Sequence, residues 1–130
     1  ANVRAQADED AAGVFALLGG QTRKINVVSL ENDGLDFLMM RFALRPNRVA
    51  GAWYIKEQRF NPEDIWENPP QSAHEWSQRL LAEGYDYVLL YQFDDAFRET
   101  FAAVFADGAV MREHTLYAVD QATGLLKEAG

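Results

Sequence analysis

Two adjacent carboxylates, Asp94 and Asp95, directly follow an apolar run of strand-forming residues at 87–93. A continuous apolar run of this length is typical of a strand covered on both faces, as in the parallel sheet of an α/β domain. Ligands in such domains bind beyond the carboxyl ends of the strands, where these two side chains are expected to lie. The pattern therefore predicts the place of a site, without assigning a reaction to it.

A second polar group follows the first predicted strand of the chain. Glu31, Asn32 and Asp33 leave that strand, and a neighbouring position in the sheet would put them in one crevice with Asp94 and Asp95. Clustered carboxylates bind hard cations such as Mg²⁺ or Ca²⁺, and they also accept hydrogen bonds from sugar hydroxyls. A simpler interpretation is that Asp33 and one of the later pair cap helices, because caps are common at strand-to-helix turns.

Aromatic and basic side chains supply two more candidate binding groups. Trp66 lies in a proline-rich stretch at 56–71, where it either stacks on a sugar or anchors a partner protein, or else fixes this stretch to the core. Arg41, Arg45 and Arg48 form a basic cluster around a proline. Binding of an anionic head group and neutralisation of nearby acids are both open roles for these arginines.

The motifs of common catalytic sites are missing from the sequence. No glycine-rich phosphate loop or G-x-S-x-G turn follows a predicted strand, and the chain has no cysteine. His74 and His114 are isolated histidines without a second ligand at the spacing of a zinc site. We therefore expect no catalytic residue, no metal centre and no cofactor in this domain, and whether a parent protein is an enzyme stays uncertain.

Length and composition indicate one folded domain spanning residues 1–130. The chain is 48% hydrophobic and 12% aromatic, which supports a real core. Its net charge of −8 argues against a nucleic-acid partner, because phosphate binding needs a basic surface. No apolar stretch approaches the roughly 18–20 residues of a membrane span. The first residue is Ala1, which fits either a processed terminus or a piece of a larger membrane protein.

Helical and strand patterns alternate along most of the chain. Helices are expected at about 8–18, 34–45, 73–83 and 95–106, and strands at about 24–30, 49–55, 87–93, 115–119 and 125–127. This order predicts an α/β fold with a three-layer, mostly parallel, Rossmann-like sheet and a C-terminal β-hairpin. Right-handed crossovers make at least the first three strands parallel, with the topological switch between the first and the third.

From about Trp66 onward, the chain resembles the extracytoplasmic soluble domain of bacterial polytopic membrane proteins related to type C glycosyltransferases. The resemblance covers roughly half of the chain and depends on structural residues of the second half. These are Trp76 with Leu80, the run Gly84-Tyr85-Asp86-Tyr87-Val88-Leu89-Leu90-Tyr91, then Asp94-Asp95-Ala96-Phe97, and finally Thr115-Leu116-Tyr117-Ala118-Val119.

The resemblance implies a non-catalytic accessory module on the extracytoplasmic face of the cell membrane. Its parent would be a glycosyltransferase using a lipid-linked sugar, and its partners would be the membrane-embedded portion of its own chain and a glycan or protein. No residue here matches the catalytic carboxylates of such enzymes. The alternative is a stand-alone α/β protein that binds a divalent cation and a polar ligand among Glu31, Asp33, Asp94 and Asp95.

Overall fold

The computed structural model describes residues 3–29, 35–51, 70, 72–106 and 108–130. The helices are α1 (Val3–Leu18), α2 (Leu35–Ala43), α3 (Ala73–Ala82) and α4 (Asp95–Phe101), and a short 3-10 turn η1 (Ala102–Val104) extends the last of them. The strands are β1 (Lys24–Val28), β2 (Arg48–Gly51), β3 (Tyr87–Leu90), β4 (Thr115–Val119) and β5 (Leu126–Glu128).

The five strands form one mixed sheet in the order β2-β1-β3-β4-β5. β1 pairs in parallel with both β2 and β3, so the chain passes to one side of β1 and then to the other. The prediction of three parallel strands with a switch between the first and third is therefore confirmed. β4 pairs antiparallel with β3, and β5 pairs antiparallel with β4, as expected for a closing hairpin.

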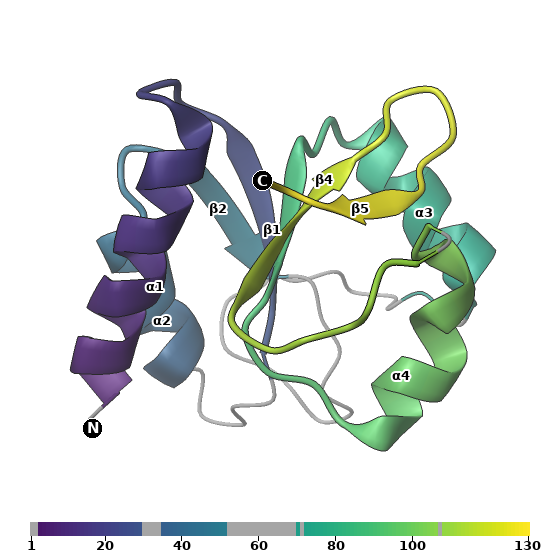
Figure 1. The fold of residues 1–130 in the computed structure, drawn as a ribbon, viewed down its shortest axis with the longest axis horizontal. Coiled ribbons are helices and arrows are strands. Elements are labelled where there is room, and N and C mark those ends of the chain that lie inside the picture. The colour runs from purple at the N-terminus through teal and green to yellow at the C-terminus, as the bar shows by residue number, and fades with distance from the viewer. Residues whose placement is uncertain (1–2, 30–34, 52–69, 71, 107) are drawn as a thin grey trace.

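The α/β class is confirmed, but the prediction of a mostly parallel sheet is wrong for its second half. After α4 and η1, the chain returns to the end of the sheet where β3 stops, and β4 starts there and runs back beside β3 (Figure 1). Leu90 and Thr115 are paired at this end, and the Glu113 carboxylate accepts a hydrogen bond from the Phe93 N–H at 3.1 Å. A helix after a strand normally indicates a crossover to a parallel strand. Here the segment after α4 and η1 brings the chain back to the end where β3 stops, so β4 is antiparallel to β3.

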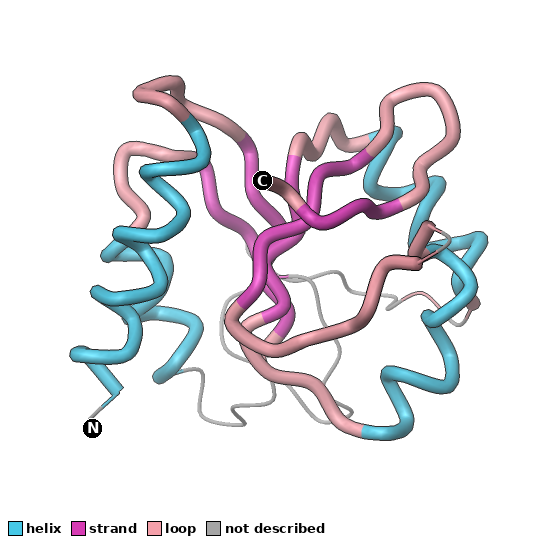
Figure 2. Tube along the Cα trace, viewed as in Figure 1, coloured by secondary structure: helices cyan, strands magenta, loops and turns pink. Residues whose placement is uncertain are grey.

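Helices cover both faces of the sheet, with α1 and α2 on one side and α3 and α4 on the other (Figures 1 and 2). Successive side chains of β1 point to opposite faces, so Val27 joins the core under α1 and α2 whereas Val28 joins the core under α3 and α4. The second core is aromatic: the ring centroids of Trp76 and Phe97 lie 5.4 Å apart in an edge-to-face arrangement.

Local sequence signals explain where α3 and α4 begin. The Ser72 hydroxyl accepts a hydrogen bond from the Glu75 N–H at 3.1 Å, and the Asp94 carboxylate accepts one from the Phe97 N–H at 2.8 Å. Several predicted boundaries are wrong by a few residues. α1 starts at Val3 rather than Asp8, β3 stops at Leu90 rather than residue 93, and the regular part of α4 ends at Phe101.

The hairpin between β4 and β5 packs closely on α3. Gly124 has a φ of +77°, and a Cβ atom at this position would lie 2.0 Å from the Ser77 hydroxyl oxygen. Only glycine satisfies both the left-handed backbone and this contact. The Asp120 carboxylate fixes the start of the turn, because it accepts hydrogen bonds from the N–H groups of Ala122 and Thr123, both at 2.9 Å.

Candidate functional site

The predicted acidic crevice is only partly within the described residues. Asp94 acts as the N-cap of α4, which bears out the structural interpretation for that side chain. The Asp95 side chain is 96% exposed and lies 4.0 Å from the Arg98 Nε. Glu31, Asp33 and Trp66 lie outside the described residues, so their part in a site remains a prediction. Among the described residues, no group of three or more acidic, histidine or cysteine side chains is arranged to hold a metal ion.

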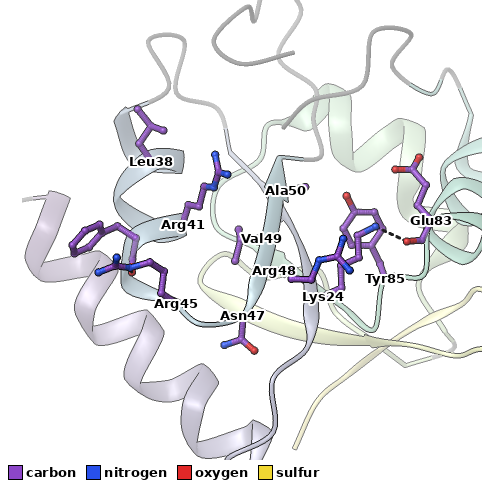
Figure 3. A pocket seen from close by; sticks show the side chains of 11 residues that line it. Lys24, Leu38, Arg41, Arg45, Asn47, Arg48, Val49, Ala50, Glu83 and Tyr85 are labelled. Carbon is purple, nitrogen blue, oxygen red and sulfur yellow. Dashed lines mark hydrogen bonds between the residues drawn. The ribbon is translucent and has the colours of Figure 1, made fainter. Parts of the chain in front are cut away.

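A basic groove lies along the edge of the sheet at β2, with a volume of about 790 Å³. Its described lining residues come from β1, α2, the turn between α2 and β2, β2, and the segment between α3 and β3. They are Lys24, Leu38, Arg41, Phe42, Arg45, Asn47, Arg48, Val49, Ala50, Glu83 and Tyr85. Figure 3 shows β2 in the middle of the groove, with α2 on one side and Lys24, Tyr85 and Glu83 on the other. We call this feature the basic groove.

The turn between α2 and β2 is held rigidly, and this fixes one end of the groove. The Asn47 side chain is buried: its amide nitrogen donates to the Leu44 carbonyl at 2.9 Å, and its amide oxygen accepts from the Arg23 N–H at 2.7 Å. The Asn47 side chain therefore ties the end of α2 to the residue before β1. This role could not be read from the sequence, because Arg23 is 24 positions away from Asn47.

The α2 wall of the basic groove combines a cation with an aromatic ring. The Arg45 guanidinium lies 3.8 Å from the centroid of the Phe42 ring, and its Nε donates to the Phe42 carbonyl at 3.3 Å. Phe42 itself is 61% exposed, and Leu38 on the same helix is 47% exposed. Arg41 points from α2 toward β2 in Figure 3. This wall thus offers positive charge beside uncovered apolar surface.

The opposite wall is positioned by β1 and the turn before β3. The Lys24 ammonium donates to the Glu83 carbonyl and lies 4.3 Å from the centroid of the Tyr85 ring, which holds it at the groove. Arg48 is the Cα partner of Lys24 in the β1–β2 ladder, so two cations stand side by side on adjacent strands. Like charges at such positions repel each other, and a bound anion would relieve this repulsion.

The charges of the basic groove contrast with those of the whole chain. The chain carries 12 lysines and arginines against 20 acidic residues, yet the described residues that line the groove include four cations and one carboxylate, that of Glu83. Within the described part of the chain, neither Arg45 nor Arg48 forms an ion pair with a carboxylate. Neutralisation of acids outside the described residues stays a prediction for these arginines.

Sequence reasoning found three of the four cations but not the groove. Arg41, Arg45 and Arg48 are close in sequence, whereas Lys24 and Tyr85 come from other elements and meet them only because β2, β1 and β3 are neighbours. The available signal was Lys24 at the start of a β-branched strand, and it becomes informative only with the strand order.

Comparisons with protein-family models, with curated proteins and with solved structures find no significant match to this chain.

Proposed function

We propose that this domain is a non-catalytic accessory module that binds an anionic acceptor or partner in the basic groove. In its wider setting it belongs to the extracytoplasmic face of a membrane protein, a glycosyltransferase that uses a lipid-linked sugar donor. The observation that carries the binding role is the gathering of Lys24, Arg41, Arg45 and Arg48 around one groove in a chain of net charge −8.

The chemistry of the groove favours binding over catalysis. Arginine and lysine side chains donate charge-assisted hydrogen bonds to phosphate and carboxylate groups, and they remain protonated at neutral pH. Among the described residues, the lining has one carboxylate and neither histidine nor serine, so this part of the groove supplies no nucleophile paired with a base. An anion held there would be positioned rather than converted.

The membrane setting is supported by the resemblance of the second half of the chain. Trp76, which belongs to that pattern, is buried in the aromatic core, and Asp94 caps α4 as such a structural pattern requires. No described helix has the length and apolar character needed to cross a bilayer. In this proposal the resemblance places the module beside the membrane-embedded portion of its own chain.

The binding role is tested with inorganic pyrophosphate, which is a compact polyanion. Isothermal titration of the 130-residue chain should give saturable binding that weakens as salt is raised. Reversing one exposed groove charge, Arg48→Glu, should lower the affinity about tenfold or more, because a charge-assisted contact becomes a repulsion.

Lys127→Glu provides the matched control, since Lys127 is exposed on β5 and does not line the basic groove. This variant makes the same change in net charge and should leave the affinity within about twofold of the unmodified chain. Equal weakening by both variants would mean that overall charge alone attracts the anion. Absence of saturable binding to the unmodified chain would contradict the proposal.

A further inference from the structure

The two edges of the sheet differ in how they are covered. β5 forms one edge, and there Phe105 forms a bridge with Leu126 while the Ala106 N–H donates to the Leu126 carbonyl at 2.8 Å. β2 forms the other edge, and no described segment pairs with its outer side. Uncovered edges are templates on which another extended chain can pair, so proteins usually block them.

The main chain of Val49 faces the outer side of β2, with which no described segment pairs. The Arg48 N–H donates to the Arg23 carbonyl at 3.0 Å, so the main-chain groups of Arg48 point toward β1. Main-chain groups of successive residues in a strand point alternately to opposite sides, and those of Val49 therefore point outward. The basic groove runs along this same edge, because both Arg48 and Val49 line it.

A strand that pairs with the outer edge of β2 would have cations on both of its faces. Val49 packs into the core under α1 and α2, so Arg48 belongs to the opposite face, beside its ladder partner Lys24. Arg45 lies in the turn that follows α2, on the α2 side of β2 (Figure 3). An added strand projects its side chains alternately to these two faces, and each face offers it a cation.

We propose that the basic groove binds an extended, acidic peptide segment, which adds to the outer edge of β2 as a sixth strand. The inference rests on the proposed function, and it names the partner class as protein. Main-chain hydrogen bonds to Val49 give the peptide its orientation, and glutamate or aspartate side chains on either face meet Arg45, Arg48 and Lys24. The exposed rings and aliphatic groups of Phe42 and Leu38 accept an apolar residue of the same segment.

A fluorescein-labelled hexaglutamate peptide tests the strand addition, with hexaglutamine as the uncharged control. The hexaglutamate should bind, and the same peptide N-methylated at every amide should bind about tenfold more weakly or worse, since it keeps its charge but loses its donors. The exchange of the Val49 N–H with solvent should slow about tenfold at saturation. Arg45→Glu and Arg48→Glu should each lower the affinity for the hexaglutamate peptide, and Lys127→Glu should not.

Equal binding of the methylated and unmethylated peptides, or an unchanged exchange rate at Val49, would overturn strand addition. Binding of hexaglutamine as tight as that of hexaglutamate would overturn the acidic character of the partner. Pyrophosphate binding tests the proposed function independently of the peptide, so it distinguishes a failure of strand addition from a failure of anion binding in the groove. If the chain binds pyrophosphate in an Arg48-dependent way but not the peptide, the groove is an anion site and the partner is not an extended acidic segment.

Discussion

The Asp120 side chain holds the turn between β4 and β5, and its ionisation affects the stability of the fold. Main-chain N–H groups, first that of Thr123 and then that of Ala122, hold the pKa of the Asp120 carboxyl below its ordinary value of 3.8. A carboxyl whose pKa is lowered on folding stabilises the fold at pH values above its unfolded pKa. This contribution is lost as the pH falls through the lower pKa of the folded state.

Asp120→Asn should therefore destabilise the domain at neutral pH, and the difference from the unmodified chain should shrink below the unfolded pKa of 3.8. Asparagine keeps an acceptor oxygen for the same turn but does not ionise. Urea unfolding of both chains over a range of pH measures the difference. If the difference in free energy of unfolding between the two chains stays constant into strong acid, the charge of Asp120 does not contribute to stability.

Asn26 shows the limit of sequence reasoning at this scale. It lies in the middle of β1, fully buried, and neither atom of its side-chain amide has a hydrogen-bond partner among the described residues. A run of Ile25, Asn26 and Val27 reads simply as a strand, because the cost of an unsatisfied amide depends on neighbours that only the fold supplies.

Between elements, a polar contact over a long sequence distance joins α1 to the residue before β4. The His114 Nδ1 lies 2.6 Å from an Asp10 carboxylate oxygen, and the two residues are 104 positions apart. The Asp10 side chain is only 7% exposed, and the His114 ring meets the Tyr91 ring edge-on with centroids 5.0 Å apart. Gln6 also donates to Asp10, at 2.9 Å.

Replacing His114 should loosen α1 from the sheet. His114→Asn should lower the free energy of unfolding by about 1–2 kcal/mol, because the nearly buried Asp10 carboxylate loses its contact with His114 and keeps only that with Gln6 among the described residues. Asparagine suits the φ of +58° at this position, so backbone strain does not confuse the result. Urea unfolding gives the loss, and amide exchange should quicken within α1.

A double-mutant cycle with Asp10→Asn isolates this contact from the other effects of each change. The coupling between the two positions should be about 1 kcal/mol. Additive losses, or faster amide exchange spread evenly over the whole chain, would mean that the pair does not hold α1 in place.

Much of the element scale could be predicted from the sequence. The strand expected at about 24–30 and the helices expected at about 73–83 and 95–106 are the right kind of element. The direction of β4 could not be predicted, because the segment after η1 has no periodicity that says where it returns. The basic groove escaped prediction for a related reason: Lys24 and Arg48 become neighbours only through strand pairing.

For the whole molecule, the account depends on an uneven distribution of charge. A chain of net charge −8 repels polyanions at long range, yet four of its cations surround one groove at the β2 edge. The Debye length is about 8 Å at physiological ionic strength, so salt weakens the long-range repulsion more than the attraction at contact distance. We therefore expect a bound polyanion to be held by the cations of the basic groove, where its site can be mapped.

The most direct measurement is a map of amide chemical shifts as pyrophosphate is added to the isotope-labelled chain. The account predicts that the largest changes cluster at the basic groove, at Lys24, Arg45, Arg48 and Val49. In Arg48→Glu the same changes should need about tenfold or more pyrophosphate to reach half of their full size. Changes centred instead on the N-terminus of α4, or spread without a focus over the surface, would contradict the claim that the edge of β2 is the binding site.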